Sequence, residues 1–204
     1  SYLQEMESLA SYLIDKKKYK RIACFYQNDS YGFSGLSAIK KAMERRGMHL
    51  VSQGRYERNT VAVMGAVRDI YKGKPEAIVM VGAYSACAEF IKLSKTKYGK
   101  DVIFCNISFV GTESLKNALG GYGENVIVSQ VVPNPKDMSI PLIREYVADM
   151  KLYQHDAPIS YSTLEGYIAG RLFTEICMKV EGELTREKFL QTMHDIGRFD
   201  LGGI

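Results

Sequence analysis

Polar and aromatic side chains follow three short apolar runs of this sequence, at the points where the runs end. The residues concerned are Asp29, Ser30, Tyr31, Tyr84, Ser85, Ser108 and Phe109. If the runs are strands of one parallel α/β sheet, these residues follow the carboxyl ends of the strands, which is where such sheets bind ligands. We therefore expect the functional residues of the chain to be among them.

Most of these residues also have a structural interpretation. Tyr31 and Tyr84 could pack over the following helices instead of a ligand, and Asp29 and Ser30 are typical turn or N-cap residues. Ser85 could cap its helix, or it could offer a hydroxyl or a helix N-terminal amide to an anionic group. The sequence leaves both interpretations open.

Catalytic and metal-binding patterns are not evident in the sequence. The three histidines, His49, His155 and His194, do not follow the apolar runs, where a general base would be expected. The GxSxG, GxxxxGKS/T and GxGxxG motifs are absent, and the four cysteines form no CxxC pair. We expect no catalytic residues, no metal site and no cofactor, with an α/β enzyme as the remaining alternative.

Five apolar segments alternate with helical patterns over residues 1–130. The expected strands are 22–26, 50–52, 77–81, 102–106 and 126–129. An unbroken apolar run is typical of a parallel strand that is buried on both faces, and apolar residues at helical spacing fill the intervals. The sequence predicts an α/β fold with a doubly wound parallel sheet of about five strands.

Local signals predict details of the helices. Phe33 belongs to the apolar stripe expected for the second helix, and Val61 to that of the third. Thr112 is expected to cap a short helix after the fourth strand.

The pattern changes at residues 131–135, where two prolines disfavour a helix. Residues 131–204 then show three helical patterns without a clear strand, so we expect a hinge crossing and a helical segment. Ser162 and Glu165 have the spacing of a capping box, although Glu165 could instead be a buried carboxylate. The closing Gly-Gly pair indicates a turn toward further structure, and we expect the chain to be a fragment.

Composition argues against two kinds of partner. The net charge of +4 arises from 27 basic and 23 acidic residues, and the basic residues are scattered, whereas a nucleic-acid surface needs a concentrated basic face. No apolar run approaches the ~20 residues of a transmembrane helix, so we expect no membrane span in this chain.

Several stretches resemble one known family. Residues 21–32, 81–84 and 106–111, at the first, third and fourth strand ends, are similar to the second lobe of the type I periplasmic binding proteins. Residues 163–172 and 199–203 are also similar to that lobe. The resemblance covers essentially the whole chain and is to the leucine/isoleucine/valine-binding, receptor-family branch. That branch contains solute receptors of ABC importers and extracytoplasmic sensor domains.

The resemblance implies half of a binding site in a cleft between two lobes that close by a hinge motion. Residues 1–130 would be the second lobe, and residues 131–204 would cross the hinge and pack on a first lobe. Tyr31 and Tyr84 match aromatic positions that contact ligand in the family, and Tyr161 could enter the cleft. Without a first lobe, the apolar stripes of residues 160–195 would fold back, pair between chains or remain exposed.

The resemblance also implies a partner and a location. The chain would capture a small molecule for an ABC permease, in the periplasm or another extracytoplasmic space; the alternative is the input domain of a membrane receptor with a kinase or cyclase. Amino-acid receptors of the family carry an acidic residue near the fourth strand end, where this chain has Ile107, Ser108 and Phe109. Because no carboxylate follows that strand, an aromatic, carboxylate or other small polar solute becomes as plausible a ligand as an amino acid.

Overall fold

The chain forms two compact units, divided after Val131. The computed structural model describes residues 2–204, and each unit has a hydrophobic core of its own. Ser1, the expected start of the first domain, lies outside the described residues.

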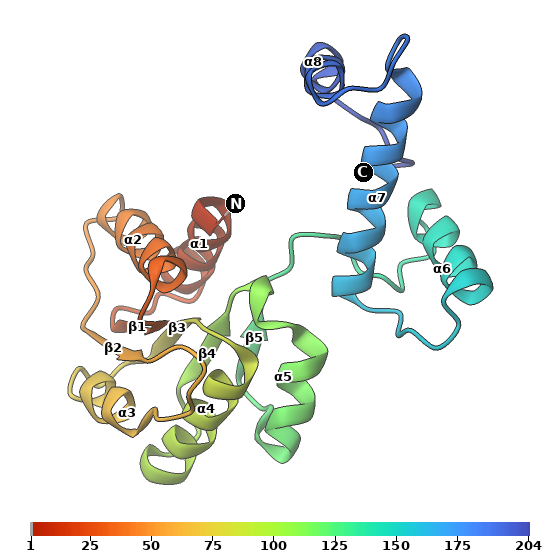
Figure 1. Ribbon diagram of the computed structural model, residues 1–204. Helices are drawn as coiled ribbons and strands as arrows, with labels where there is room; N and C mark the ends of the chain where they lie inside the picture. The colour runs from red at the N-terminus through yellow and green to blue at the C-terminus, as the bar shows by residue number, and fades with distance from the viewer. Residues whose placement is uncertain (1) are drawn as a thin grey trace. The chain divides into compact units, whose positions relative to one another are not determined.

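The first unit contains a five-stranded parallel sheet with the strand order β2-β1-β3-β4-β5 (Figure 1). The strands are β1 (Ile22–Gln27), β2 (Ser52–Tyr56), β3 (Ala77–Val81), β4 (Ile103–Asn106) and β5 (Val126–Val128). The direction of the strand order reverses between β1 and β3, which makes their carboxyl ends the switch point of a doubly wound sheet. The predicted fold class is confirmed.

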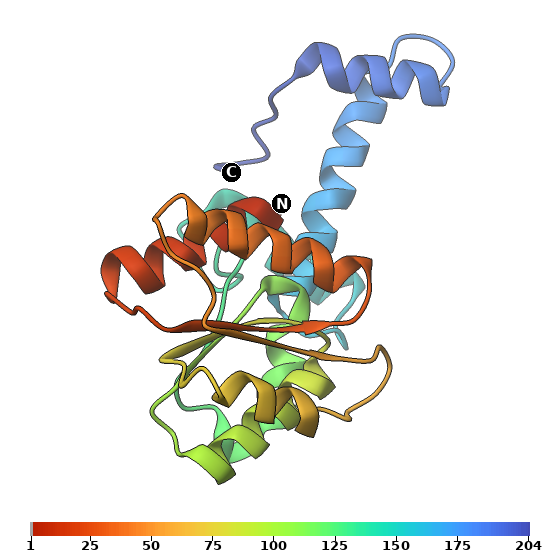
Figure 2. The same cartoon turned by 90° about the vertical axis from the view of Figure 1, so that its left-hand side faces the viewer.

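Helices cover both faces of this sheet, as the edge-on view in Figure 2 shows. The helices are α1 (Tyr2–Ala10), α2 (Ser30–Glu44), α3 (Met64–Tyr71), α4 (Tyr84–Tyr98) and α5 (Thr112–Leu119). Helices α1 and α2 bury their apolar sides against one face, and α3, α4 and α5 bury theirs against the other. Alternate residues of β1 serve the two cores, since Phe25 belongs to one and Cys24 to the other. Both faces of the sheet are therefore buried.

The second strand is displaced from its predicted position. The apolar strand β3 has its predicted bounds, and all of its side chains are buried. The sequence predicts the second strand at residues 50–52, but β2 begins at Ser52. Because β2 is an edge strand and buries only Gly54 and Tyr56, it contains no apolar run to mark it. A Cβ on Gly54 would lie 2.8 Å from the carbonyl oxygen of Ala66, so this glycine allows α3 to approach β2.

Two predictions about apolar stripes are wrong. The side chain of Val61 is 54% exposed, because α3 begins only at Met64 and the buried residue just before it is Val63. Phe33 is 47% exposed and covers the ring of Tyr26 from outside the core.

Two expected N-caps are displaced by one or two residues. Helix α4 begins at Tyr84, so Ser85 lies in its first turn, and the N-cap position is held by Ala83 without a side-chain hydrogen bond. Helix α5 has Gly111 as its N-cap. Thr112 is the first helical residue, and its Oγ1 accepts a hydrogen bond of 2.7 Å from Gln130 Nε2.

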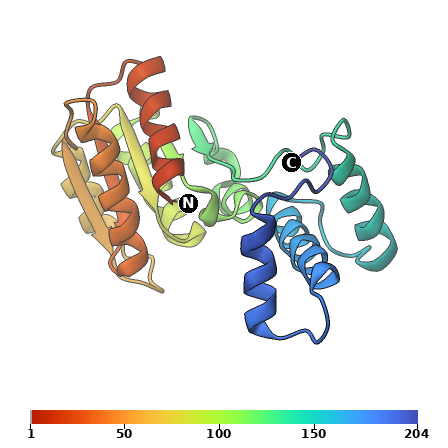
Figure 3. The same cartoon turned by 90° about the horizontal axis from the view of Figure 1, so that it is seen from above.

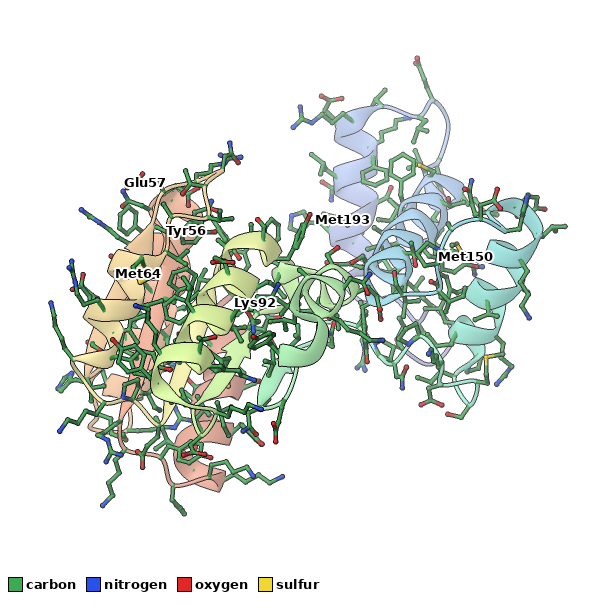
Figure 4. All side chains as sticks on the ribbon, turned by 90° about the horizontal axis from the view of Figure 1, so that it is seen from below. Tyr56, Glu57, Met64, Lys92, Met150 and Met193 are labelled. Carbon is green, nitrogen blue, oxygen red and sulfur yellow. The ribbon has the colours of Figure 1, made fainter. Side chains whose placement is uncertain are left out.

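The second unit consists of three helices and the segments between them. The helices are α6 (Pro141–Tyr153), α7 (Tyr161–Lys179) and α8 (Arg186–Ile196). Its core consists of Ile143, Tyr146 and Leu164, with partly buried neighbours that include Met150, which Figure 4 labels beside α6 and α7. This core therefore joins α6 to the first half of α7.

The expected capping box of α7 lies two residues earlier than predicted. Ser160 Oγ accepts from the backbone N–H of Thr163, and Thr163 Oγ1 accepts from the backbone N–H of Ser160. Ser162 is already helical, and the side chain of Glu165 is exposed, so Glu165 is neither a cap nor a buried carboxylate. The hydroxyl of Tyr146 joins this box through a 2.6 Å hydrogen bond with Thr163 Oγ1.

Several apolar side chains of the second unit are exposed. Helix α8 lies beside α7 (Figure 3), and the rings of Phe173 and Phe189 are 5.2 Å apart. However, Phe173 is 58% exposed, Met178 77% and Leu184 56%. Helix α8 buries none of its residues. Among the predicted stripe residues of this segment, Leu164 and Ile176 are buried and Leu190 is 43% exposed. The packing of these stripes on a first lobe stays a prediction.

The buried cysteines are free thiols. Cys24 and Cys105 point into the core under α1 and α2, whereas Cys87 points into the core on the other face of the sheet. Within residues 2–204, no cluster of histidine, cysteine or acidic side chains could hold a metal ion. None of the helices described combines the length and the apolar character that crossing a bilayer requires.

Candidate functional site

The carboxyl ends of the five parallel strands lie along one edge of the sheet. Tyr26 pairs with Val81 and Met80 pairs with Asn106, so the segments that follow β1, β3 and β4 emerge side by side. Residues 28–31, 82–85 and 107–109 therefore share this edge. Except for Tyr161, the predicted site residues lie in these three segments.

The hydroxyl of Tyr56 joins the ends of three strands. It donates a 2.8 Å hydrogen bond to Gln27 Oε1 at the end of β1 and accepts a 2.9 Å hydrogen bond from the backbone N–H of Ala83 after β3. The side chain is 2% exposed, and its ring stacks on Phe25 with centroids 5.0 Å apart. Figure 4 labels Tyr56 at the end of β2, with Glu57 beside it. Burial raises the pKa of Tyr56 to about 12, so the hydroxyl stays protonated and able to donate.

Asp29 is the N-cap of α2, which confirms its structural interpretation. Its Oδ1 accepts from the backbone N–H of Gly32 at 3.1 Å, and its Oδ2 accepts from Gln27 Nε2 at 2.5 Å. The hydrogen bond from Gly32, with a further one from Gln27, holds the pKa of Asp29 below its usual value. Ser30 is exposed at the first position of α2. The carboxylate of Asp29 is therefore committed to the protein itself.

Tyr31 lies in an aromatic cluster at the edge. Its ring centroid is 5.6 Å from that of Tyr2 and 4.8 Å from that of Phe109. The hydroxyl of Tyr31 is buried, and among the described residues it has no hydrogen-bond partner. Burial raises the pKa of this hydroxyl far above its ordinary value, so it stays neutral with an unused donor. Tyr31 thus packs on its neighbours and still offers a polar group.

The segments after β3 and β4 present exposed groups. Tyr84 is 46% exposed and Phe109 63% exposed, large fractions for aromatic side chains. Ser85 is exposed in the first turn of α4. Ser108 is half-buried, and its backbone N–H donates to Glu5 Oε2 at 3.1 Å. Exposed rings and hydroxyls therefore lie on the same edge as the buried tyrosines.

Glu5 is a residue of this edge that the sequence analysis misses. It lies on α1 and is 7% exposed, yet in sequence it looks like an acidic residue on the solvent side of an amphipathic helix. The signal that could have revealed it is its position four residues before Leu9 and eight before Leu13, on the stripe that α1 buries.

Tyr161 is the first residue of α7 and belongs to the second unit, where it is half-buried. Its predicted role in a cleft between lobes stays a prediction.

Two surface hollows lie away from the strand ends. One of about 670 Å³ is lined by residues of α1, the following π-helical turn and Arg46. The other, of about 610 Å³, lies between α7 and α8 in the second unit. Both are lined mainly by charged and polar side chains, unlike the aromatic edge.

The groups at the edge suit noncovalent binding. Aromatic faces contact apolar or planar groups, the hydroxyl of Tyr31 can donate a hydrogen bond, and the carboxylate of Glu5 can accept one. The three histidines are exposed and lie outside the segments that follow the strands.

Comparisons with known proteins identify relatives of the whole chain. The model of a family described as "Periplasmic binding protein" matches residues 1–203. A comparison with curated proteins found no match. Among solved structures, a possible leucine/isoleucine/valine-binding protein from Rhodopirellula baltica is 33% identical, with a TM-score of 0.93, and the alignment covers 100% of this chain and 56% of that one.

More distant structures share the fold. A substrate-binding periplasmic protein from Ralstonia solanacearum is 22% identical, with a TM-score of 0.88, and the alignment covers 100% of this chain and 57% of that one. A fatty acid ABC transporter substrate-binding protein from Thermomonospora curvata is 21% identical, with a TM-score of 0.84, and the alignment covers 100% of this chain and 53% of that one. The chain thus spans a little over half the length of the solved structures it matches.

Proposed function

Because the chain belongs to the periplasmic binding protein family, we propose that it forms the second lobe of a two-lobed, extracytoplasmic solute-binding protein that serves an ABC importer. Its membership confirms the resemblance that the sequence suggests. The protein would clamp a small molecule between its lobes and release it to a permease without changing it.

One observation carries this proposal: large aromatic side chains are exposed at the edge of the sheet where doubly wound folds bind ligands. Phe109 and Tyr84 come from different strand ends, and Tyr31 lies against Phe109 with an unused hydroxyl. Exposing aromatic surface to water is unfavourable unless something covers it. A ligand and a facing lobe would cover it.

The second unit supports the same proposal. Its exposed Phe173, Met178 and Leu184 offer an apolar surface on α7 and on the segment before α8. In a two-lobed protein, we propose that residues 132–204 pack on the first lobe and that Tyr161 faces the cleft. The relatives' chains contain about as much additional length as such a lobe requires.

We propose a ligand that combines a carboxylate with an apolar part. The rings of Tyr31, Tyr84 and Phe109 would contact the apolar part. Ser85, in the uncapped first turn of α4, would donate to the carboxylate through its hydroxyl or backbone N–H. One relative is described as a possible leucine/isoleucine/valine-binding protein, and another as a fatty acid ABC transporter substrate-binding protein. Both descriptions fit this combination.

The test uses the protein produced at its full genetic length. Mass spectrometry of molecules released on denaturation would identify a co-purifying solute. Calorimetry would then measure the affinity of this solute for the wild-type protein and for the Tyr84→Ala variant. Loss of ring contacts worth about 1.5–3 kcal/mol corresponds to an affinity about 10- to 150-fold weaker. The matched control, Tyr122→Ala, removes a 41% exposed tyrosine of the same unit and should leave affinity unchanged.

Equal affinities of the two variants would contradict the assignment of Tyr84. Chemical conversion of the bound solute would contradict a binding role. A kinase or cyclase sequence in the same gene would replace the importer with a membrane receptor, with the same lobe as its sensor.

A further inference from the structure

Basic residues that are scattered along the sequence come together at one edge of the folded sheet. This edge, which we call the amino edge, consists of the five segments that lead into the strands: 17–21, 45–51, 72–76, 99–102 and 120–125. Nine of the 27 basic residues lie in these segments, but only three of the 23 acidic residues do. The rest of the chain is therefore net acidic, although the chain as a whole has a charge of +4.

The opposite edge of the sheet shows no such excess of positive charge. The segments that follow the strands are 28–29, 57–63, 82–83, 107–111 and 129–131. Together they contain one basic and two acidic residues. Positive charge is thus concentrated at the amino edge, and the aromatic side chains proposed to bind ligand lie at the other ends of the strands.

Hydrogen bonds join the segments of the amino edge into one surface. Arg21 Nε donates to the carbonyl oxygen of Lys74 at 2.8 Å, so the segments before β1 and β3 lie together. Asn125 Nδ2 donates to the carbonyl oxygen of Lys100 at 3.0 Å, which joins the segments before β4 and β5. Because β3 and β4 are neighbours in the sheet, these two pairs of segments are adjacent.

Five lysines of the amino edge are exposed and belong to none of the ion pairs within residues 2–204. They are Lys17, Lys18, Lys20, Lys74 and Lys100. The basic residues of this edge that are paired with carboxylates are Arg21, Arg45, Arg46 and Lys72. More than half of the cations at the amino edge are therefore available to a partner.

Helix ends explain only part of this charge. Helix C-termini carry a partial negative charge, and Lys17 is the C-cap of the π-helical turn that follows α1. Lys18, Lys20 and Lys74 lie beyond the C-caps, where this interaction has fallen off. The helices therefore do not account for the charge of these three lysines.

Exposed tyrosines lie beside these lysines. Tyr122, in the segment before β5, is 41% exposed, and Tyr98, the last residue of α4, is 49% exposed. Tyr98 also stacks on Tyr71 at the end of α3, with ring centroids 3.9 Å apart. Tyrosine and lysine side chains have an apolar body and a polar end, which suits the boundary between a bilayer and water. Two features of a membrane-binding surface thus occur together at this edge.

We propose that the amino edge binds the surface of a bilayer that contains anionic phospholipids. This inference goes beyond the proposed function and takes only the extracytoplasmic location from it. That location puts the bilayer that holds the importer within reach. Each lysine near an anionic bilayer strengthens binding about fivefold, so five lysines give a dissociation constant of about 0.3 mM in lipid. Such weak attachment would keep the receptor near its importer and leave the carboxyl ends of the strands free for a solute.

The test measures co-sedimentation of the full-length protein with lipid vesicles at low salt. Vesicles of phosphatidylglycerol and phosphatidylcholine in equal parts should bind the protein at least tenfold more tightly than vesicles of phosphatidylcholine alone. Salt at about 0.5 M should abolish the difference, because it screens exposed charges. This comparison requires no variant, so it remains decisive even if a variant fails to fold.

Lys20→Gln combined with Lys74→Gln then assigns the binding to the amino edge. Removing two lysines should weaken binding to the anionic vesicles about 25-fold. The matched control combines Lys136→Gln with Lys151→Gln, two exposed lysines of the second unit. It changes the net charge equally and should leave vesicle binding unchanged.

Three results would overturn the inference and leave the proposed function intact. One is equal binding to vesicles with and without anionic lipid. Another is an equal effect of the two double variants, which would mean that the amino edge is not the binding surface. The third is tighter binding to duplex DNA than to anionic vesicles, which would identify a different partner. The proposed function is tested separately by solute binding, because vesicle binding requires no solute.

Discussion

Replacing Tyr56 with phenylalanine removes the hydroxyl that joins β1, β2 and β3 and leaves the ring in place. Gln27, which is 7% exposed, loses the donor to its Oε1, and an unsatisfied buried acceptor costs about 1–3 kcal/mol. The backbone N–H of Ala83 also loses its acceptor but lies nearer to solvent, so its loss costs about 0.5–1.5 kcal/mol. The sum is about 3 kcal/mol, which corresponds to a fall in Tm of about 6–12 °C for a chain of this size.

Thermal unfolding followed by circular dichroism measures this change at pH 7. Tyr122→Phe is the matched control, because Tyr122 is 41% exposed and its hydroxyl makes no hydrogen bond that the structure records. Its effect should be within about 0.5 kcal/mol of zero. If Tyr56→Phe shifts the Tm no more than the control does, the hydroxyl does not hold the strand ends together.

The pH dependence gives a second measurement on the same pair of proteins. The pKa of Tyr56 is raised to about 12 in the folded chain, above the value of about 10 for an unfolded tyrosine. The stability contributed by the neutral hydroxyl is therefore complete below pH 10 and is lost as the pH rises toward 12. The gap in stability between wild type and Tyr56→Phe should shrink over this range; a constant gap would contradict the reasoning.

Two further predictions concern the residues that start α2. Gly32→Ala should destabilise the protein by at least about 3 kcal/mol in urea unfolding, because the new Cβ would lie 1.8 Å from the carbonyl oxygen of Gln27; Gly170→Ala, with open space in α7, should stabilise by about 0.5–1 kcal/mol. Asp29→Ala should cost about 1 kcal/mol at pH 7, and Asp29→Asn much less. Because the pKa of Asp29 is lowered, the cost of Asp29→Ala should fade as the pH drops through that pKa, and a constant cost down to pH 2 would contradict the cap.

The buried strands could be predicted from sequence because burial on both faces leaves an unbroken apolar run. Residues 77–81 form such a run and have the bounds expected of them. The edge strand β2 could not be located in this way, because it pairs with a strand on one side only and its sequence is mostly polar. Its position depends on Gly54, which fits against α3, and on Tyr56, whose partners lie on other strands.

The candidate site was only partly visible in the sequence. Exposed aromatic residues after strands follow from topology, because parallel strands bring their carboxyl ends to one edge. The burial of Glu5 agrees with its place on the apolar stripe of α1, but its contact with Ser108, a residue 103 positions away, cannot be found from local periodicity. The cap of α7 was misplaced because Ser160 pairs with Thr163, whereas the usual capping-box pattern requires a glutamate or glutamine.

The free thiols inside the sheet have a consequence if the protein works outside the cytoplasm, as we propose. Cys24 and Cys105 lie two strands apart, about 9.6 Å, which is too far for a disulfide, and Cys87 lies in the opposite core. Burial raises the pKa of Cys24 and Cys105 to about 12, so neither reacts while the first unit is folded. Only the folded structure therefore protects these two thiols from oxidants. The rate at which a thiol reagent modifies them measures how often the first unit unfolds.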